Sequence, residues 1–201
     1  MRMKLTRRQK EIIDASIELI ARKGIQELTI KNLSAVVGIS EPAIYRHFGS
    51  KGEILSALLI SFGDRNEEAF RRIAGLDEPP AQKLRAVFEH HFRNFADNPS
   101  FSAVLFSEDL FRNDNRLSGQ MYHMMQRAQG FVLDLVTEGQ RSGQLRIEVP
   151  AAQLTLMLIG SLRLLVTQWR LSGYAFDLTQ EGRKLWNTLE AIIAAPGAST
   201  G

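Results

Sequence analysis

The stretch that decides the fold is GISEPAIYRHFGSK, which runs from Gly38 to Lys51. Within it a turn glycine and a proline stand beside two aromatic residues and three basic side chains, Arg46, His47 and Lys51. A buried segment would contain more apolar residues, and an ordinary exposed helix does not need an aromatic, a histidine and an arginine side by side. The composition therefore indicates a surface that contacts something specific.

Start and stop signals divide the chain around this stretch into short helices. Thr6 is a suitable N-cap and Gly24 a suitable C-terminal glycine for a first helix, and Thr29 and Gly38 bracket a second helix in the same way. Ser40 begins a third helix, whose first turn holds a glutamate and a proline. A three-residue turn with a glycine between two short helices is typical of a helix-turn-helix.

Helical periodicity continues through the rest of the sequence. Ser50 caps a helix that begins at Lys51, and no alternating stretch longer than LRIEV appears. We therefore predict an all-α fold of about nine helices, with an N-terminal three-helix bundle that contains the helix-turn-helix. The helices after the bundle are expected at residues 51–74, 81–96, 101–111, 116–142, 151–171 and 178–194. The predicted domains are 1–52 and 53–195, followed by a disordered tail, 196–201.

Charge and composition narrow the function. Residues 1–51 hold ten Lys/Arg and five Asp/Glu, whereas the remaining residues hold fifteen and seventeen, so the net charges are +5 and −2. Such asymmetry suggests a polyanion partner for the N-terminal quarter, and a basic solvated surface is the alternative. The chain has no cysteine and therefore no disulfide framework, which fits a reducing cytoplasm. With no signal peptide expected, and with an uncharged apolar stretch (149–162) shorter than the roughly 20 residues of a membrane span, we predict a cytoplasmic protein without membrane contact.

The stretch from Gly38 to Lys51 has side chains suited to DNA. In a helix-turn-helix the second helix enters the major groove. Glu41 is able to accept a hydrogen bond from cytosine N4, and Arg46 is able to donate to guanine. The Tyr45 hydroxyl, and Lys51 at a helix N-terminus, suit phosphate oxygens. Pro42 and Ala43 face the groove, and His47 is able to reach a base or a phosphate. Ile44 and Phe48 complete the apolar side of the bundle.

The run LTIKNLSAVVGISEPAIYRHFGSKGEIL, residues 28–55, resembles the DNA-binding motif of the TetR family of bacterial transcriptional regulators. The shared pattern is a threonine that opens the second helix, a glycine turn, a Tyr-x-x-Phe recognition helix and a lysine after a short turn, and the resemblance extends from about Arg8 to Leu59. It implies a homodimer on a palindromic operator and a helical C-terminal domain that dimerises and binds a small apolar or amphipathic effector. It assigns phosphate contacts to Thr29, Tyr45 and Lys51, and base contacts to Lys31, Glu41, Pro42, Ala43, Arg46 and His47. Glu41 departs from the neutral or basic residue of many relatives, and either reads cytosine or caps its helix.

The C-terminal residues carry weaker signals. By the family pattern the last two long helices form a dimer interface, with candidates Leu154, Leu158, Ile159, Leu162, Leu185, Leu189 and Ile192. An apolar ligand pocket has the candidates Phe92, Phe95, Met121, Met124, Met125, Phe131 and Trp169, because methionine adapts to varied shapes. Internal core packing is the alternative explanation for both sets.

Metal and catalytic chemistry are not expected. His90 and His91 are adjacent and point about 100° apart on a helix, so they cannot chelate together, and neither they nor His123 belongs to a cluster of ligands. The sequence has no glycine-rich phosphate loop and no G-x-S-x-G or HExxH motif, and solvation explains the Glu108-Asp109 pair.

We therefore predict that the protein binds no cofactor. The predicted function is that of a ligand-responsive repressor. The alternative is a DNA-binding protein that organises chromosomes or acts through protein partners without an effector, and an enzyme is the remotest possibility. The sequence does not identify the operator, the regulated genes, the effector or the sign of regulation.

Overall fold

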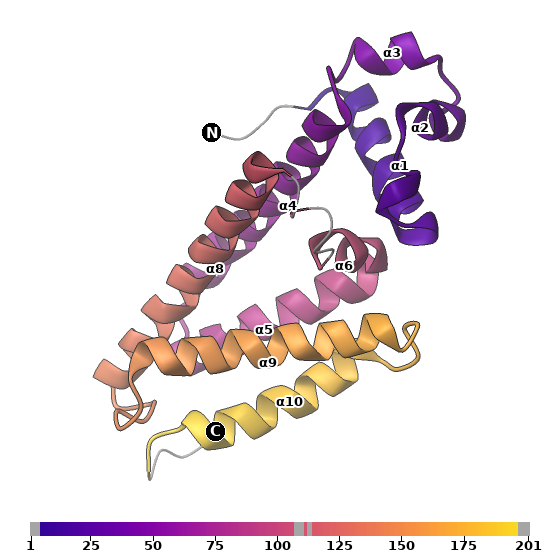
Figure 1. Cartoon of the computed structure of the whole chain (residues 1–201). Coiled ribbons are helices and arrows are strands. Elements are labelled where there is room, and N and C mark those ends of the chain that lie inside the picture. Colours follow the sequence, from indigo (N-terminus) through magenta and orange to yellow (C-terminus); the bar gives the residue numbers. More distant parts are fainter. Residues whose placement is uncertain (1–4, 107–110, 112–113, 197–201) are drawn as a thin grey trace. The chain divides into compact units, whose positions relative to one another are not determined.

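The computed structural model describes residues 5–106, 111 and 114–196 of the chain, and these residues form an all-α fold, as predicted (Figure 1). Nine α-helices and one 3-10 helix, η1 (Ile25–Glu27), occur in the described part, and the only extended pairing there is an isolated bridge between Leu145 and Ala194. The α-helices are α1 (Arg7–Lys23), α2 (Ile30–Val37), α3 (Glu41–Tyr45), α4 (Lys51–Ala74), α5 (Pro80–Asp97), α6 (Pro99–Leu105), α8 (Asn115–Arg141), α9 (Ala151–Leu171) and α10 (Leu178–Ile193).

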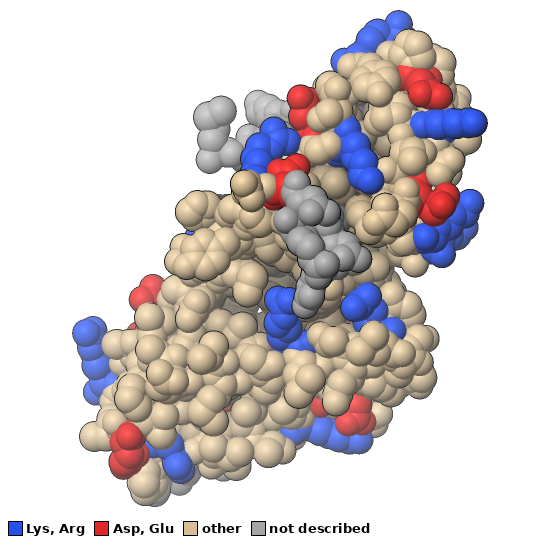
Figure 2. Space-filling view, viewed as in Figure 1, with Lys and Arg blue, Asp and Glu red and all other residues tan. Residues whose placement is uncertain are grey.

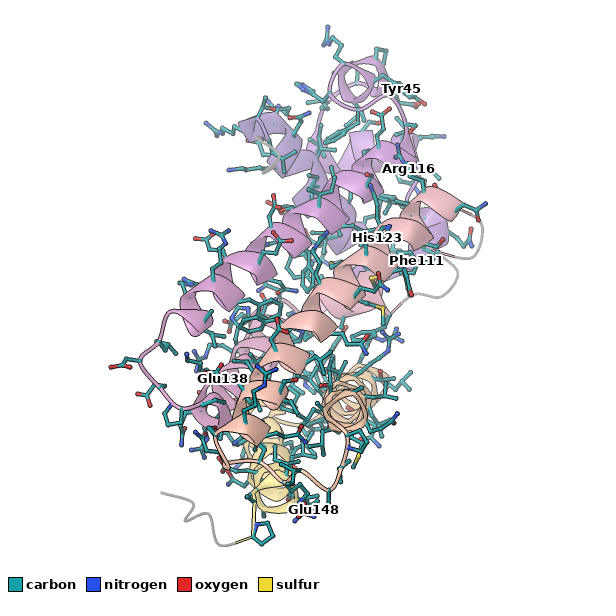
Figure 3. The ribbon with its side chains drawn as sticks, turned by 90° about the vertical axis from the view of Figure 1, so that its left-hand side faces the viewer. Tyr45, Phe111, Arg116, His123, Glu138 and Glu148 are labelled. Atoms are coloured by element: carbon teal, nitrogen blue, oxygen red, sulfur yellow. The ribbon has the colours of Figure 1, made fainter. Side chains whose placement is uncertain are left out.

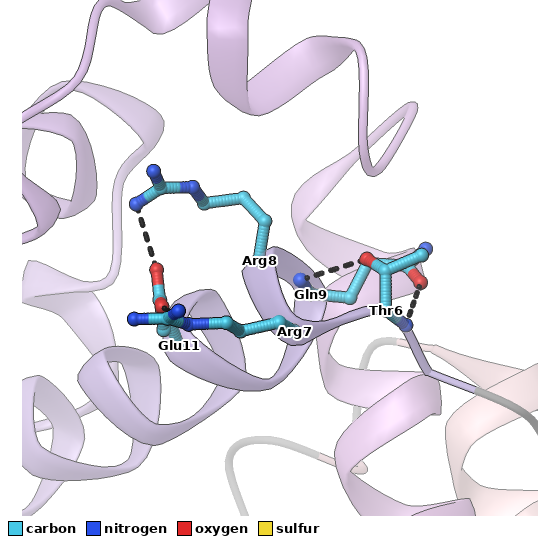
Figure 4. Close-up of polar contacts among 5 residues, drawn as sticks. All are labelled: Thr6, Arg7, Arg8, Gln9 and Glu11. Atoms are coloured by element: carbon cyan, nitrogen blue, oxygen red, sulfur yellow. Dashed lines mark hydrogen bonds and ion pairs between the residues drawn. The ribbon is translucent and has the colours of Figure 1, made fainter.

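Helix boundaries follow the capping residues of the sequence. Thr6 and Gln9 form a capping box at the start of α1, in which the Gln9 N–H donates to Thr6 Oγ1 at 3.2 Å and the Thr6 N–H donates to Gln9 Oε1 at 3.0 Å (Figure 4). At the other end Gly24 adopts φ 86°, a conformation that favours glycine. The Glu53 N–H likewise donates to Ser50 Oγ at the start of α4. The predicted starts of α1 and α4 are confirmed.

Some predicted features fall outside the described residues. These are the Glu108-Asp109 pair and the tail after Pro196. The helix expected over 101–111 is described as α6, which begins at Pro99 and ends at Leu105.

The chain divides into two compact units. Unit 1 comprises residues 1–66 and 98–124, and unit 2 comprises residues 67–97 and 125–201. These units are not the domains expected at 1–52 and 53–195, because α4 and α8 each contribute residues to both units. A functional division after residue 52 remains a prediction.

Unit 1 is built around α1. This helix packs against α2 and α6, and its residue Ile12 is fully buried together with Leu33 and Ile44. Gln120 on α8 donates to the Ser56 hydroxyl on α4 at 2.8 Å. Helix α3 is too short to be stable by itself, and its buried residue Ile44 anchors it in the core.

Unit 2 is organised by α5, α9 and α10, which lie along one another (Figure 1). The rings of Phe88 and Trp186 lie 4.9 Å apart between α5 and α10. A Cβ added to Gly182 would overlap the Phe92 ring, so the absence of a side chain at this position lets α10 approach α5 closely. Trp169 donates from Nε1 to the Phe176 carbonyl at 2.9 Å, which fixes the end of α9.

Candidate nucleic-acid interface

A left-handed glycine makes the turn between α2 and α3. Gly38 has φ 73° and ψ 31°, and the N–H groups of Gly38 and Ile39 both donate to the Ser34 carbonyl, at 2.9 and 3.1 Å. Ser40 is the N-cap of α3 with extended backbone, although its side chain makes no capping hydrogen bond. The predicted helix-turn-helix is therefore present, with the turn and both helices as expected.

The residues from Glu41 to His47, here called the recognition segment, form α3 and the turn after it. The α-helix ends at Tyr45, whereas helical hydrogen bonds continue from the Arg46 N–H to the Pro42 carbonyl and from the His47 N–H to the Ile44 carbonyl. Arg46 and His47 thus lie on an extension of the helix.

Exposure divides the recognition segment into two sides. Glu41, Pro42 and Arg46 are exposed, and Tyr45 keeps 52% of its surface exposed (Figure 3). Ala43 and His47 are half-buried. Ile44 and Phe48 are buried, at 0% and 5%, and their predicted core role is confirmed. Of the residues of this segment that are predicted to contact bases, Glu41, Pro42 and Arg46 therefore lie on the outer side, whereas Ala43 and His47 are partly covered.

The side chains that are predicted to contact phosphates differ in the hydrogen bonds that they already make within the chain. The Thr29 hydroxyl already accepts the Asn32 N–H at 3.1 Å as the N-cap of α2, but it keeps its own proton as a donor. Lys51 is half-buried, its Nζ donates to the Ile25 carbonyl at 3.3 Å, and burial lowers its pKa. An ammonium group has three donors, so Lys51 is able to keep this bond and also contact a phosphate. Lys31, predicted to contact bases, is exposed on α2.

The structure bears on the two alternatives for Glu41. Among the described residues its carboxylate accepts no hydrogen bond, so it does not cap α3 through a backbone N–H. Its charge in the first turn still favours the helix dipole, by about 0.3–1 kcal/mol in general. The exposed carboxylate remains available to accept from a base.

Sequence reasoning missed a residue that positions the recognition segment. Gln9 Nε2 donates to the His47 carbonyl at 3.2 Å and so ties α1 to the end of that segment. The Thr6-x-x-Gln9 spacing, which is that of a capping box, was the available signal. The hydrogen bond from Gln9 to His47 joins residues 38 positions apart, so no local sequence pattern indicated it.

Two arginines near the start of α1 were also missed. Arg7 and Arg8 stand in the first turn, where positive charge opposes the helix dipole, and both pair with Glu11, at 3.0 and 2.7 Å (Figure 4). Unfavourable placement of basic residues at a helix N-terminus is the signal that could have singled them out. Lys and Arg side chains are spread over the surface of α1 to α3 among a few acidic ones (Figure 2).

The dimer candidates lie mostly inside the chain. Leu154, Leu158, Leu162 and Leu189 are buried, at 1%, 1%, 8% and 8% exposure, so these four residues belong to the core of unit 2. Ile159 and Leu185 are half-buried, and Ile192 keeps 46% of its surface exposed. The dimer interface itself stays a prediction. Periodicity alone cannot separate the two apolar faces of α9, so most of the residues that it selected are buried within the chain.

The exposed face of α9 carries other large apolar residues. Leu156, Met157, Leu164 and Leu171 are exposed at 59%, 52%, 58% and 74%. By length and composition α9 is able to cross a membrane. Only 28% of its most apolar 18-residue stretch is buried within the chain. A helix that packs against a second subunit meets the same criteria.

The pocket candidates do not form one group. Met121 and Met124 belong to unit 1 and the other five to unit 2. Phe131 stacks on Phe70 at 4.7 Å, Trp169 packs edge-on against Tyr174 at 4.7 Å, and Met125 is exposed. Of the seven, Phe92 lines a cleft of about 230 Å³ between α5 and α10.

The histidines occupy separate environments. His90 and His91 are neighbours on α5, whereas His123 is exposed on α8 (Figure 3). Burial, and then the adjacent His90, lower the pKa of His91 to about 4. No group of three or more His, Cys, Asp or Glu side chains in the described residues could hold a metal ion.

Comparison with known proteins identifies the family. The sequence model of the bacterial regulatory proteins of the tetR family matches residues 12–58, and the model of the C-terminal region of YsiA-like proteins matches residues 62–192, more than half of the chain. The chain therefore belongs to the TetR family of bacterial regulatory proteins. It is a DNA-binding transcriptional regulator, and the predicted function is confirmed at this level.

Individual relatives are distant but span the chain. A nucleoid occlusion factor, SlmA of Photobacterium profundum, is 24% identical over 94% of this chain and 97% of its own length. The fatty acid metabolism regulator protein of Bacillus subtilis is 25% identical over 84% of this chain and 86% of its own length. The crystal structure of FadR from Bacillus subtilis in complex with stearoyl-CoA has a TM-score of 0.76 and 23% identity, and covers 92% of this chain and 98% of that one. None of these names describes an enzyme.

Proposed function

We propose that this protein is a ligand-responsive repressor that binds a palindromic operator as a homodimer in the cytoplasm. The observation that carries the DNA-binding part is the recognition segment, in which exposed Glu41, Arg46 and Tyr45 stand on a fully buried Ile44. Buried and exposed residues thus alternate so that the polar side chains are held outward on a rigid base. Arg46 reads guanine and Glu41 reads cytosine, while Thr29, Tyr45 and Lys51 hold phosphates.

Arg7 and Arg8 extend the phosphate contacts of this proposal. Their pairing with Glu11 orients both guanidinium groups near the start of α1. Exposed ion pairs contribute little to stability, so exchange of the carboxylate for a phosphate costs little.

The homodimer is proposed from the uncovered face of α9. Leu156, Met157 and Leu164 lie at helical spacing around Gly160, and no described residue comes within 4 Å of the position of a Cβ added there. Ile192 of α10 is also exposed, at 46%. A two-fold interface would place the same surface of each subunit against the other. Replacement Leu164→Glu should convert a dimer to a monomer in sedimentation equilibrium, and wild-type protein that is monomeric would contradict the proposal.

Regulation is proposed to act by population shift through α4. This helix is continuous from Lys51, in unit 1, to Ala74, in unit 2. An effector that binds unit 2 more tightly in one conformation shifts the equilibrium towards that conformation. Half-sites on DNA lie roughly 34 Å apart, so a change of a few ångströms in the distance between two recognition segments would release the operator.

Selection of bound sequences from a random duplex pool tests the function. We expect the purified protein to enrich a palindrome with two half-sites about one helical turn apart. Enrichment of a single asymmetric site would contradict the dimeric operator, and failure to enrich any sequence would contradict sequence-specific reading.

A second candidate function comes from the nucleoid occlusion factor that is similar over 94% of the chain. A chromosome-organising protein would use the same recognition segment but would need no effector. Many genomic sites spread along the chromosome, with no small-molecule response, would favour it. A few sites beside genes would favour the repressor.

A further inference from the structure

We propose that the cleft between α5 and α10, here called the α5–α10 cleft, binds a small monocarboxylic acid with an aromatic or short aliphatic body. The cleft has a volume of about 230 Å³ and lies entirely within unit 2. As a statement about the effector, this inference rests on the proposed function. As a statement about binding, it rests on the cleft alone.

Three arginines give the α5–α10 cleft its charge. Arg85 and Arg93 come from α5 and Arg183 from α10, and Glu89 is the acidic residue among the lining side chains. Arg85 is partly engaged, since its Nη2 donates to Asn187 Oδ1 at 3.2 Å and its Nε lies 4.0 Å from Glu89 Oε1. The excess of guanidinium groups over carboxylates favours an anion.

Two of the arginines are only weakly engaged in the described residues, where the charge of Arg183 acts on the exposed Asp177 and helps to lower the pKa of that carboxyl group. Neither Arg93 nor Arg183 forms an ion pair or a side-chain hydrogen bond there, and both are exposed. A guanidinium group binds a carboxylate through two parallel hydrogen bonds. Both arginines are therefore available for a carboxylate that enters from solvent.

The wall of the cleft is aromatic and includes an unsatisfied donor. Phe88, Phe92 and Trp186 line it and keep 1%, 2% and 1% of their surfaces exposed. Trp186 Nε1 is buried and has no hydrogen-bond partner among the residues that the structure describes. A buried indole N–H normally finds an acceptor, and an oxygen bound against this wall would supply one. Cationic and apolar groups together match an acid with an apolar body.

The size of the cleft limits the ligand. Pockets for drug-sized ligands measure roughly 300–1,000 Å³, and about 230 Å³ lies below that range. A long-chain acyl-CoA therefore exceeds the cleft, whereas benzoate or hexanoate suits it. Inorganic phosphate has the charge but no apolar body.

Calorimetric titration of the full-length protein, without DNA, tests the site with benzoate, hexanoate, inorganic phosphate and coenzyme A. We expect saturable binding of benzoate or hexanoate, and at least about tenfold weaker binding of phosphate and coenzyme A, because neither fits both the charge and the wall. Absence of carboxylate binding, or phosphate binding of equal affinity, would overturn the proposal.

Two adjacent residues of α10 provide a matched pair of variants. Arg183→Gln removes a lining charge and should weaken carboxylate binding about tenfold or more, the range for a hydrogen bond to a charged group. Lys184→Gln makes the same change of charge on an exposed residue that pairs with Glu181 outside the cleft, and should leave binding unchanged. Equal losses in both variants would show a general effect of charge and refute the site.

A second variant addresses the buried donor. Trp186→Phe keeps an aromatic ring and removes the N–H, so carboxylate binding should weaken severalfold. Undiminished binding by a folded Trp186→Phe protein would remove the indole from the site, and Arg183→Gln decides the site if this variant does not fold. Since the assay contains no DNA, binding without any effect on the operator would overturn the regulatory role and leave the site intact.

Discussion

The recognition segment and the α5–α10 cleft both present arginine side chains to solvent, but on opposite kinds of surface. Arg46 is exposed in the turn after α3, and Ile44, two positions before it, is buried in the core. Arg183 stands at the edge of a cleft whose wall is made of Phe88, Phe92 and Trp186. The first arrangement suits a long polyanion with polar base edges, and the second suits a small anion with an apolar body.

The two regions also differ in how they are built. The recognition segment depends on neighbours in sequence, with Gly38 and Ser40 placed a few residues before it. The cleft depends on the approach of two helices about 90 residues apart, which the absence of a side chain at Gly182 permits. Substitutions in the first region should therefore act on DNA recognition, and substitutions in the second on packing and ligand binding.

The largest effect is expected from removal of the support beneath the recognition segment. Ile44→Ala should lower the free energy of unfolding by about 2–5 kcal/mol, because Ile44 is fully buried. Chemical unfolding measures this change, and the exposed Val36→Ala is the control, with less than about 0.5 kcal/mol expected. A loss below about 1 kcal/mol for Ile44→Ala would show that α3 does not depend on this contact.

Two substitutions in the N-terminal region should separate reading from phosphate contact. Arg46→Ala should cost about 1–3 kcal/mol on the selected operator and little on random DNA. Lys51→Ala should weaken binding to both, and should reduce the slope of log K against log salt by about 0.9. Fluorescence anisotropy over a series of salt concentrations measures both quantities. Identical effects of the two variants on operator and random DNA would refute the division of roles.

The helices of unit 2 should respond to mild acid. The lowered pKa of His91, about 4 in the folded protein against about 6.5 when unfolded, means that folding favours the neutral ring. Stability is then full above about pH 6.5 and falls as pH drops towards 4, by roughly 2 kcal/mol between about pH 7 and pH 5. Burial, Arg72 and Arg93 lower the pKa of the adjacent His90 too, so both rings act in the same direction.

Urea unfolding at a series of pH values tests this expectation. His91→Phe keeps a ring against Phe70 and removes the titrating group, so its stability should vary less with pH than that of the wild type. The exposed His123→Phe should keep the wild-type dependence. A His91→Phe curve parallel to the wild type would contradict the assignment.

The smallest effect is expected at the close approach of α10 to α5. Gly182→Ala should destabilise the protein by about 1 kcal/mol, since overlap with Phe92 costs about 1–3 kcal/mol and the gain in helix propensity returns up to about 1. Gly130→Ala, where the added methyl meets nothing within 4 Å, should be neutral or stabilising. Equal thermal unfolding curves for the two variants would show that the approach of α10 to α5 is not constrained by Gly182.

The sequence predicted most of the fold because its helix boundaries are local. Thr6, Gly24, Ser50 and Gly38 act through hydrogen bonds and backbone angles within a few positions, so the capping pattern alone located α1, α2 and the start of α4. The recognition segment was predictable for the same reason. Its tie from Gln9 to the His47 carbonyl was not, because it joins residues far apart in sequence.

Features formed by packing between distant helices were largely missed. The periodicity of α9 marks an apolar helix but not which of its apolar faces points inward, so buried Leu154 and exposed Leu156 could not be told apart. For the cleft, Phe92 was named as an apolar lining residue, whereas Arg183 and Arg93 had no motif to connect them. Only the packing of α5 against α10 brings these arginines to one aromatic wall.

The measurement that most directly tests the account is the affinity for the selected operator as benzoate or hexanoate is added, for the wild type and for Arg183→Gln. We predict that the acid that binds the α5–α10 cleft weakens operator binding by the wild type at least about fivefold, a coupling typical of allosteric regulators, and leaves Arg183→Gln unaffected at the same concentration. Operator affinity that stays constant when the cleft of the wild type is saturated would contradict the account.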